Sequence, residues 1–393
     1  MHVNRDINTC NGGFILIQIK GKYSDAMIMC IGDENDGNVD RYAISQIKMI
    51  CDTEAANGSN IVVMPDVHPG KVGPIGLTMT VKDAIMPALL GIDIGCGMGM
   101  VKVGKVRKDF QKLDSIIKKN IPVGFDIRSN VHAKAQDFDL ARLICAELIR
   151  YDKAMLSIGT LGGGNHFIEI DCDSTGEGYL IVHTGSRHLG KEVAEYYMGE
   201  GHKLLKKQGK KDVPYELTYI TDELLSDYLH DVAVVQKYAD LNRRVIVSEI
   251  AKGMKWKFDE IHSCIHNYVD FEGDTPILRK GAISAKKGEE VIIPVNMRDG
   301  VILGTGFGNR EWNVSAPHGS GRIASREKIL SSHTVSEFKS EMKGIYSTCI
   351  GKATLDEAPF AYREISYIQD AIAETADIMK ILKPVYNYKG GNA

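Results

Sequence analysis

The sequence has no apolar stretch that is long and uninterrupted enough to cross a membrane. Its most apolar long window, Pro87 to Val101, contains Asp93 and four glycines, whereas a membrane-spanning helix needs about 20 predominantly apolar residues. The N-terminus lacks a basic segment followed by an apolar one, so no signal peptide is expected. No segment is rich in proline and serine and no repeat is evident, which excludes a linker and a solenoid.

Cysteine is sparse, and neither sign of charge dominates. The 8 cysteines are widely and irregularly spaced, which is untypical of a disulfide framework and indicates a reducing compartment. The 48 basic and 51 acidic residues leave a net charge of −3. No global positive field therefore attracts nucleic acid, and a phosphate-rich partner has to bind a local patch. We expect a soluble cytoplasmic protein.

The remaining composition is that of a folded enzyme, with 44% hydrophobic residues and 40 glycines. Short runs rich in β-branched residues and bounded by Gly, Pro, Asn or Asp predict strands at Phe14–Ile19, Ile61–Met64, Leu77–Val81, Phe167–Ile170, Leu180–Val182, Val291–Ile293 and Val301–Leu303. Helical periodicity predicts helices over residues 40–56, 107–119, 138–151, 188–208, 222–253 and 369–382. Because strands and helices interleave without strict alternation, we predict an α+β fold in one compact domain over residues 1–393.

Two details of the predicted helices can be compared with a structure. In the last helix, Ile372, Ala376 and Met379 share one face, and Pro384 follows its end. The fourth helix runs into the lysine-rich segment 202–211. We interpret this segment as a solvated helix end, where cations are favoured; the alternative is a patch that contacts a phosphate backbone.

The histidines indicate a metal site. Five of them lie within two residues of Gly, Asn or Asp, near predicted strands or turns: His68, His166, His183, His266 and His318. Asp93 and Cys96 lie three residues apart in a glycine-rich turn, so their side chains can converge. Imidazole, thiolate and carboxylate together suit a divalent transition metal such as Mn, Fe, Co or Zn, and a thiolate can bridge two such metals, as in phosphoryl chemistry. Alternatively, Cys96 is a buried small apolar residue and Asp93 caps a turn.

Three glycine-rich segments, at residues 161–165, 303–308 and 318–322, indicate anion binding. Each offers backbone N–H groups of the kind that bind phosphate, and Arg322 adds a guanidinium fork. None has the spacing of a P-loop or dinucleotide-binding motif; the alternative is that these glycines only form tight turns. His318 precedes the last segment and has three possible roles, as a metal ligand, a general acid or a nucleophile that forms a phosphoramidate.

In order and spacing, these motifs resemble the RtcB family of RNA-splicing ligases over roughly residues 60 to 390. The segments that carry the resemblance are Pro65-Asp66-Val67-His68-Pro69-Gly70, Gly91-Ile92-Asp93-Ile94-Gly95-Cys96-Gly97-Met98, Gly164-Asn165-His166-Phe167-Ile168-Glu169, His183-Thr184-Gly185-Ser186-Arg187, His266-Asn267, Arg279-Lys280-Gly281-Ala282, His318-Gly319-Ser320-Gly321-Arg322, Asp356-Glu357-Ala358-Pro359 with Tyr362, and Tyr388-Lys389-Gly390.

The resemblance implies an α+β fold with central β-sheets in a sandwich-like layer flanked by helices, and a site for two Mn(II) ions. One ion would be held by Cys96, His183 and His266, and the other by Asp93, Cys96 and His166. The resemblance also implies that His318 attacks the α-phosphate of GTP to give a histidine–GMP intermediate. A 2′,3′-cyclic phosphate end would first be opened to a 3′-phosphate. The guanylyl group would pass to this RNA 3′-phosphate, and a 5′-hydroxyl would then displace GMP and seal the strand.

The same resemblance implies roles for further residues. Asn165, Gly319, Ser320 and Gly321 would bind the phosphates and ribose of GTP, Glu169 would accept hydrogen bonds from guanine, and Phe167, Tyr362 and Lys389 would contact the base. Arg187 and Arg322 would hold the RNA phosphate. As alternatives, Phe167 and Tyr362 are core residues, and Lys389 is solvated near the chain end.

One segment departs from the family. Where many members have Pro-Gly-Ser-Met-Gly, whose serine helps to bind guanine, this chain has Pro294-Val295-Asn296-Met297-Arg298-Asp299-Gly300. Asn296 would replace the serine hydroxyl, whereas Arg298 and Asp299 add charge, which favours a repair or variant branch. The expected partners are GTP, RNA with broken ends (tRNA halves or damaged RNA) and a possible activating protein. A dinuclear-metal phosphoesterase that does not use His318 is the alternative function, and a non-catalytic RNA-binding protein is a third.

Overall fold

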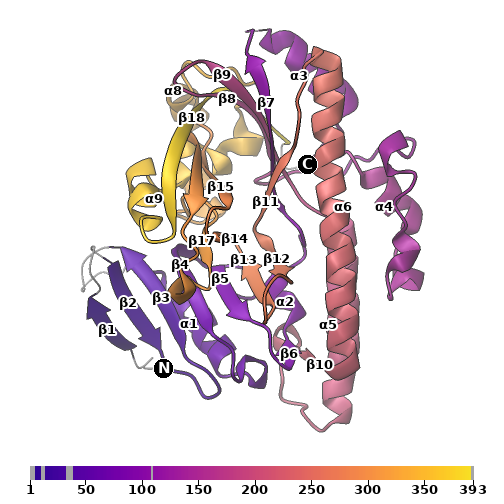
Figure 1. Cartoon of the computed structure of the whole chain (residues 1–393), viewed down its shortest axis with the longest axis vertical. Helices are drawn as coiled ribbons and strands as arrows, with labels where there is room; N and C mark the ends of the chain where they lie inside the picture. Colours follow the sequence, from indigo (N-terminus) through magenta and orange to yellow (C-terminus); the bar gives the residue numbers. More distant parts are fainter. Residues whose placement is uncertain (1–4, 10–13, 32–38, 108, 391–393) are drawn as a thin grey trace.

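The computed structural model describes residues 5–9, 14–31, 39–107 and 109–390. The other residues lie outside this description; they include Cys10, most of the segment used to judge a signal peptide, and residue 108 of the predicted helix 107–119. Two seven-stranded sheets form the centre of the molecule, and helices flank them on both sides (Figure 1). The predicted α+β fold with central sheets and flanking helices is confirmed.

The first sheet is built mainly from the N-terminal part of the chain. Its order is β1 (Arg5–Thr9), β2 (Phe14–Ile19), β3 (Ala26–Ile31), β4 (Ile61–His68), β5 (Ile75–Thr80), β13 (Ile277–Lys280) and β12 (Asn267–Asp270). Neighbouring strands are antiparallel except β3 and β4, which are parallel and are joined through helix α1 (Arg41–Cys51). A parallel pair needs such a crossover, and α1 packs Ile44, Ile47 and Ile50 into the core beneath the sheet.

The second sheet carries most of the candidate site. Its order is β11 (His262–Ile265), β7 (Gly97–Lys105), β9 (Glu177–Thr184), β8 (Phe167–Cys172), β18 (Ala376–Lys389), β16 (Gly300–Gly306) and β15 (Glu290–Asn296). Side chains alternate between its two faces. Ile168 and Ile170 of β8 pack on one face with Ile246 and Ile250 of the long helix α6 (Asp222–Met254), whereas Phe167 faces the other core. One face is therefore dedicated to packing, which leaves the opposite face of β8 for polar side chains.

The remaining elements cover the sheets or join them. Two short antiparallel pairs are formed by β6 (Ala84–Ile85) with β10 (Ile220–Thr221) and by β14 (Ala282–Ser284) with β17 (Ser315–Pro317). The other α-helices are α2 (Pro87–Leu90), α3 (Phe110–Asn120), α4 (Tyr151–Ser157), α5 (Arg187–Lys207), α7 (Arg326–Ser332), α8 (Val335–Glu341) and α9 (Ile365–Ala371). Among the described helices, none combines the length and the apolar character that crossing a membrane requires.

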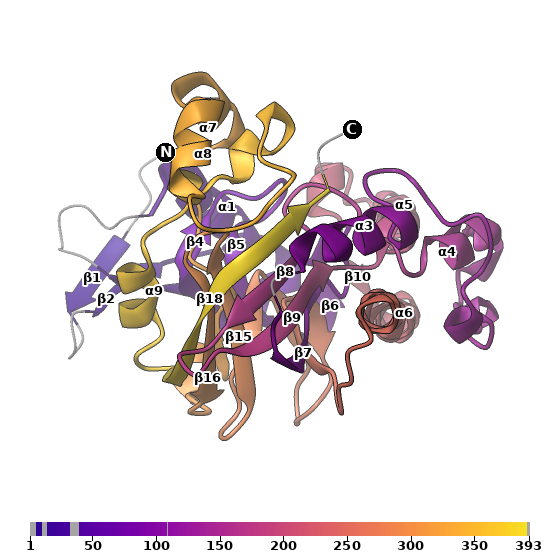
Figure 2. The same ribbon diagram turned by 90° about the horizontal axis from the view of Figure 1, so that it is seen from above.

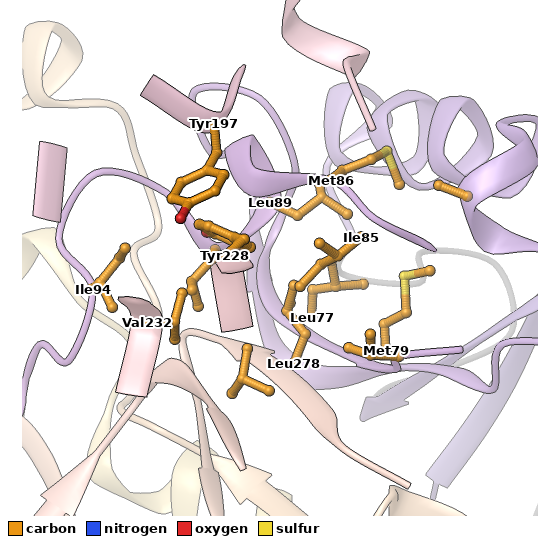
Figure 3. Close-up of a cluster of buried hydrophobic side chains, with 14 of the residues drawn as sticks. Leu77, Met79, Ile85, Met86, Leu89, Ile94, Tyr197, Tyr228, Val232 and Leu278 are labelled. Atoms are coloured by element: carbon orange, nitrogen blue, oxygen red, sulfur yellow. The ribbon is translucent and has the colours of Figure 1, made fainter. Parts of the chain in front are cut away.

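The largest core lies between the first sheet and helices α5 and α6. Figure 3 shows Tyr197 of α5 and Tyr228 and Val232 of α6 against Leu89 of α2 and Leu77 of β5. All five side chains are fully buried. Apolar burial on this scale stabilises the fold by roughly 1.5–3 kcal/mol for each large side chain. This core fixes α6 against the first sheet, and the separate core around Ile246 and Ile250 fixes it against the second. Residues along α6 can therefore support the loops at the sheet ends.

All seven predicted strands are present, and the helices predicted at 40–56, 107–119, 188–208 and 222–253 correspond to α1, α3, α5 and α6. The helix predicted at 138–151 is wrong. Two 3₁₀ turns, Leu140–Arg142 and Ala146–Leu148, precede α4 there. The carboxylate of Asp231 on α6 accepts hydrogen bonds from the backbone N–H groups of Ile144 (2.8 Å) and Cys145 (3.1 Å), so these groups cannot join a continuous helix.

The helix predicted at 369–382 is also wrong. Only Ile365–Ala371 is helical, and strand β18 follows from Ala376. Figure 2 shows β18 running between β8 and β16, and it pairs with both. These two neighbours satisfy its backbone along its length, which outweighs the helical pattern of apolar residues. Pro384, which lacks an N–H group, lies in β18 where the pairing with β8 is irregular.

Arg279 of β13 is a buried charge that joins the first sheet to β17. It is fully buried, and it donates to Ser315 Oγ (2.8 Å), Tyr268 Oη (2.8 Å) and Asp270 Oδ2 (2.7 Å). Burial by itself would raise the pKa of Asp270, but the guanidinium of Arg279 outweighs burial and holds that pKa below its ordinary value. The ion pair therefore contributes to stability only while Asp270 is ionised.

We predict that Arg279→Met lowers the free energy of unfolding by about 3–5 kcal/mol at neutral pH, because Asp270 is left buried without its main partner. The control Arg244→Met removes the exposed ion pair with Asp240 and should change stability by less than about 1 kcal/mol. Urea titrations at several pH values provide the measurement. Since the folded-state pKa of Asp270 is depressed, the difference between wild type and Arg279→Met should shrink as the pH falls below about 4. A difference that is independent of pH would contradict this assignment.

Candidate active site

Loops at the ends of β7, β8 and β9 bring the predicted metal ligands together. Asp93 and Cys96 lie in the turn between α2 and β7, and His166 directly precedes β8. His183 of β9 is paired with Met98 of β7 on one side and with Phe167 of β8 on the other. Antiparallel pairing thus fixes His183 beside both loops. His266, between β11 and β12, completes the group.

Two groups of donor atoms result, Asp93 with Cys96 and His166, and Cys96 with His183 and His266; within each group the donor atoms lie within 4.8 Å of one another. Cys96 Sγ is 3.5 Å from His166 Nε2 and 3.4 Å from His183 Nε2. His166 Nε2 is 3.0 Å from Asp93 Oδ2, and His183 Nε2 is 3.2 Å from His266 Nε2. Cys96 belongs to both groups, so one sulfur can serve two cations.

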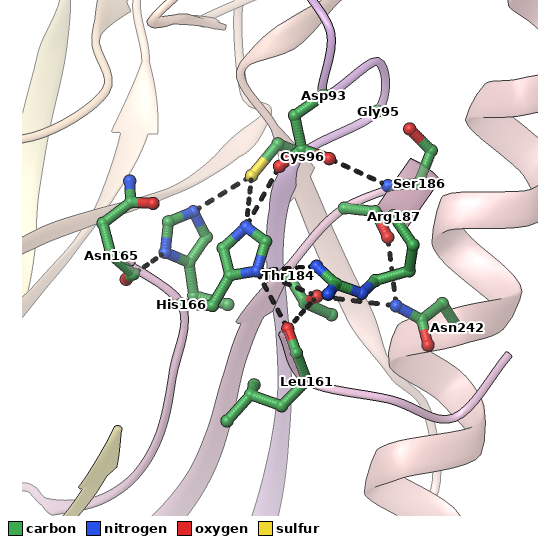
Figure 4. A network of polar contacts seen from close by, with 12 residues as sticks. Asp93, Gly95, Cys96, Leu161, Asn165, His166, Thr184, Ser186, Arg187 and Asn242 are labelled. Atoms are coloured by element: carbon green, nitrogen blue, oxygen red, sulfur yellow. Dashed lines mark hydrogen bonds and ion pairs between the residues drawn. The ribbon is translucent and has the colours of Figure 1, made fainter. Parts of the chain in front are cut away.

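Backbone carbonyls orient two of these imidazoles. His166 Nδ1 lies 2.8 Å from the carbonyl oxygen of Leu161 (Figure 4). His183 Nδ1 lies 3.1 Å from the carbonyl oxygen of Asn165. A carbonyl can only accept a hydrogen bond, so each Nδ1 carries the proton and each Nε2 presents a lone pair toward Cys96. This is the arrangement that metal-binding histidines adopt.

Helix α6 supports the loops that carry the ligands. Asn242 Oδ1 accepts from the backbone N–H of Gly159 (2.7 Å), and its Nδ2 donates to the carbonyl oxygen of Gly185 (3.0 Å). Arg243 Nη1 donates to the carbonyl oxygens of Gly95 (2.6 Å) and Thr184 (3.0 Å). Gly95 directly precedes Cys96, and Thr184 directly follows His183. The roles of Asn242 and Arg243 are not predictable from the sequence, because nothing in a helical pattern indicates contacts with distant loops.

The protonation of this cluster suits a divalent cation. Burial, together with the neighbouring imidazoles, holds the pKa of His183 and of His266 well below the ordinary value, so both are neutral donors. Burial opposes ionisation of Asp93, but His166 outweighs it and lowers the Asp93 pKa to about 2. Burial and the nearby Asp93 carboxylate raise the pKa of the Cys96 thiol well above its ordinary value. A bound cation would supply the positive charge that stabilises this buried thiolate, so the residues fit a metal site.

The donor groups open into a pocket of about 300 Å³ that collects most of the predicted site residues. Its lining includes Asp93, Cys96, Asn165, Phe167, Glu169, His183, His266, Asn296, His318, Gly319, Ser320, Gly321, Arg322, Tyr362 and Lys389. His166 and Arg187 do not line it. The lysine-rich segment 202–211, which is described throughout, also lies outside the lining; there Lys203 pairs with Glu200 (2.7 Å) and Lys210 binds Glu54 and Tyr219.

His318 is oriented by a buried carboxylate that the sequence analysis did not single out. His318 Nδ1 lies 2.8 Å from Oδ2 of Asp66, which is fully buried at the end of β4. The imidazole of His318 is 5.0 Å from that of His266, centroid to centroid. A carboxylate oxygen accepts a hydrogen bond, so the proton stays on Nδ1 of His318. Nε2 of His318 then has a free lone pair beside the candidate metal ligands. The sequence signal for Asp66 was its place in the segment Pro65–Gly70, two residues before His68, and no role was predicted for it.

Glu357 organises the cationic end of the pocket and was also missed. Its carboxylate binds Arg326 Nη1 (2.6 Å), Lys389 Nζ (2.9 Å) and Arg322 Nη1 (3.3 Å), and accepts from the hydroxyl of Tyr362. Burial opposes its ionisation, but Lys389 and the two arginines lower the pKa of Glu357 to about 2. Lys389 is buried, so it is not a solvated residue of the chain end.

Three predicted residues make other contacts than expected. Arg187 donates to the carbonyl oxygen of Gly124 (3.1 Å) and packs against Gly162, outside the pocket lining. The hydroxyl of Ser320 donates to the carbonyl oxygen of Val295 (2.7 Å). Asn296 uses Oδ1 to accept from two backbone N–H groups of its own turn, both at 2.9 Å, and donates from Nδ2 to Asp299 (2.8 Å). Its amide therefore builds the turn that departs from the family pattern.

Comparisons with known proteins agree with the resemblance seen in the sequence. A family model described as tRNA-splicing ligase RtcB matches residues 52–150 and 146–390. The RNA-splicing ligase RtcB of Escherichia coli K12 is 30% identical, over 84% of this chain and 90% of that protein. RNA-splicing ligase RtcB2 of another Escherichia coli strain is 28% identical over 94% and 98% of the two chains. The tRNA-splicing ligase RtcB of Aeropyrum pernix is 25% identical over 81% and 84%.

We predict that Cys96→Ala weakens divalent-metal binding at both donor groups by roughly 100-fold or more, because the two groups share this sulfur. Equilibrium dialysis with Mn(II) measures the stoichiometry, and the thiolate absorption of a Co(II)-loaded sample reports the sulfur–metal bond directly. Cys264→Ala is the matched control, since Cys264 is a buried cysteine of the adjacent strand β11 and belongs to neither donor group. Unchanged stoichiometry in Cys96→Ala would show that the sulfur is not a ligand.

Proposed function

This chain belongs to the RtcB family of RNA ligases, and on that premise we propose that it joins RNA 3′-phosphate or 2′,3′-cyclic phosphate ends to 5′-hydroxyl ends with GTP and Mn(II). The observation that carries the proposal is the position of His318. Its Nδ1 is held by Asp66 at 2.8 Å, and its ring lies 5.0 Å from that of the metal-ligand candidate His266. A pocket with a nucleophile and cation donors side by side suits nucleotidyl transfer.

In the first step of this proposal, Nε2 of His318 attacks the α-phosphorus of GTP. A P–N bond forms, the bond to the β-phosphate oxygen breaks, and pyrophosphate leaves. Asp66 keeps the Nδ1 proton in place and stabilises the positive charge that develops on the imidazole. Two Mn(II) ions, held by the two groups that share Cys96, would neutralise phosphate charge and polarise the phosphorus centre.

In the second step, an oxygen of the RNA 3′-phosphate attacks the guanylyl phosphorus and the P–N bond breaks, which leaves the RNA end capped by GMP through a 5′–3′ pyrophosphate. The 5′-hydroxyl of the other strand then attacks the RNA 3′-phosphorus and GMP leaves. Arg322 lines the same pocket as His318 and is held there by the Glu357 carboxylate and by the backbone carbonyl of Asp356 (2.7 Å). A guanidinium so fixed can hold a phosphate during both transfers.

The far end of the pocket would bind the base. The Glu169 carboxylate accepts hydrogen bonds from N–H groups and donates none. This pattern matches guanine, which carries N–H groups at N1 and N2, and not adenine, whose N1 is an acceptor. Phe167 and Lys389 lie beside it, with the ammonium of Lys389 at 5.7 Å from the Phe167 ring. The expected RNA substrates are tRNA halves or damaged RNA with the same kinds of ends.

We predict that the protein, incubated with α-labelled GTP and Mn(II), becomes labelled through an acid-labile, base-stable bond, and that His318→Ala is not labelled. Gel autoradiography after denaturation provides the measurement. His262→Ala is the control, because His262 is exposed on β11 and does not line the pocket. Absence of label on wild-type protein that holds metal would reject nucleotidyl transfer and favour the phosphoesterase.

We further predict that Asp66→Asn slows labelling by roughly 100-fold or more while metal binding stays unchanged. The asparagine amide can donate to Nδ1 of His318, which would move the imidazole proton to Nε2 and remove the attacking lone pair. Rates of label incorporation and metal stoichiometry are measured on the same samples. A rate close to that of wild type would show that Asp66 does not control the tautomer of His318.

A further inference from the structure

Two carboxyl groups lie next to each other behind the base-binding end of the pocket. Glu169 and Asp171 are two residues apart on β8, so their side chains point to the same face of the second sheet. Both are buried, with exposed fractions of 2% and 0%. Glu169 lines the pocket, whereas Asp171 does not. Asp171 therefore cannot touch a nucleotide, and its contacts must be with the protein.

The two carboxyl groups have different partners. Glu169 accepts a hydrogen bond from the side-chain amide of Asn387 on β18, the residue paired with it across the sheet. Within the described part of the chain, neither carboxyl oxygen of Asp171 receives a hydrogen bond from a donor group. The residue opposite Asp171 on β18 is Pro384, which has no N–H to offer. The residue opposite it on β9 is Tyr179, whose hydroxyl donates to Asp173 instead. The nearby Lys383 is exposed and points its ammonium toward the carbonyl oxygen of Asp299 (3.4 Å).

A buried carboxylate without a donor is strongly disfavoured, and two adjacent carboxylates disfavour each other further. Protonation of one carboxyl group removes the repulsion between the two, and Asp171 is the group that is protonated. Burial and the negative charge of Glu169 raise the pKa of Asp171 well above its ordinary value. Burial also raises the pKa of Glu169, to about 7, but the neighbouring Asp171, Asn387 and Lys389 favour its ionised form. With its proton, Asp171 becomes a donor, and Glu169 is the acceptor beside it.

We propose that Asp171 is a positioning residue for base recognition: its protonated carboxyl donates a hydrogen bond to Glu169 and fixes the Glu169 carboxylate to accept the N–H groups of guanine. The inference rests on the proposed use of GTP and deepens it. Donors from Asn387 and Asp171 occupy the protein side of the carboxylate. Its remaining lone pairs face the pocket, where guanine offers two N–H groups from N1 and N2 on one edge.

This arrangement accounts for selectivity among purines. Adenine presents an acceptor at N1, which would face the acceptor oxygens of Glu169, and hypoxanthine lacks the 2-amino group that guanine donates. A carboxylate held ionised and oriented rejects both, because a buried acceptor would be left unpaired. Without the Asp171 donor, the Glu169 carboxylate would instead become protonated. It could then donate a hydrogen bond to N1 of adenine.

The test compares three variants by the binding of GTP, ITP and ATP to the metal-loaded protein. Asp171→Asn keeps a donor of similar shape and should bind GTP within about threefold of wild type. Asp171→Leu removes the donor and should weaken GTP binding roughly tenfold, with the preference for GTP over ITP and ATP reduced by a similar factor. Asp173→Asn removes a carboxylate two residues further along, which binds Thr175 and Lys380 and not Glu169, and should leave nucleotide preference unchanged.

A kinetic measurement and an infrared measurement complete the test. In the labelling reaction, Asp171→Leu should raise the KM for GTP and leave kcat nearly unchanged, since the base is remote from the α-phosphate. The infrared C=O stretch of a buried protonated carboxyl should be present in wild type and absent in Asp171→Asn. This comparison does not depend on whether Asp171→Leu folds.

The outcomes separate the two levels of the proposal. Wild-type protein that takes up no GTP contradicts the proposed function itself. Wild-type protein that binds GTP while Asp171→Leu keeps its affinity and preference overturns the role of Asp171 alone. The role is also overturned if Asp171→Asn loses as much preference as Asp171→Leu, or if the protonated carboxyl band is missing from wild type.

Discussion

The sulfur of Cys96 is the atom on which the arrangement of the active site depends. It is buried, it lies 3.5 and 3.4 Å from the Nε2 atoms of His166 and His183, and it belongs to both donor groups. Such a buried thiolate needs positive charge and fixed neighbours. The fold provides the neighbours through β7, β9 and the loop before β8, and α6 holds these loops through Asn242 and Arg243. A long helix that is otherwise an ordinary packing element thus fixes ligands that are distant in the sequence.

Charge is divided along the pocket in a way that matches the proposed reaction. At one end, neutral imidazoles, the Asp93 carboxylate and the Cys96 thiol form two donor groups, and a bound cation would stabilise the thiolate form of Cys96. In the middle, Glu357 holds Arg322 and Arg326 in fixed positions beside His318. At the other end, Glu169 accepts a hydrogen bond from the amide of Asn387 and, in our proposal, one from the protonated carboxyl of Asp171, and the ammonium of Lys389 favours its ionised form. In the proposed reaction, each end would bind a different part of one nucleotide, the phosphates or the base.

The fold and the site were predictable to different degrees. Strands such as Phe167–Ile170 were predicted because β-branched and aromatic runs bounded by turn residues reflect local preferences. The helix predicted at 369–382 failed because β16 and β8 flank that segment and satisfy its backbone as a strand. The roles of Asp66, Asn242 and Glu357 were not predicted for a related reason, although Asp66 and Glu357 lie in segments that carry the family resemblance. Each acts on a partner far away in the chain, at separations that no local pattern encodes.

The sequence by itself determined the α+β class and, through motifs with unusual residue types at fixed spacing, the candidate ligands and nucleophile. Those features are chemical identities, which a sequence states directly. The tertiary structure decided their relations. It places Cys96 in two donor groups and Asp66 behind His318. It also engages the amide of Asn296 in hydrogen bonds within its own turn and keeps Arg187 out of the pocket lining. It also sets Asp171 beside Glu169 without a donor. Distances and burial control protonation and orientation, and both arise only when separate segments pack together.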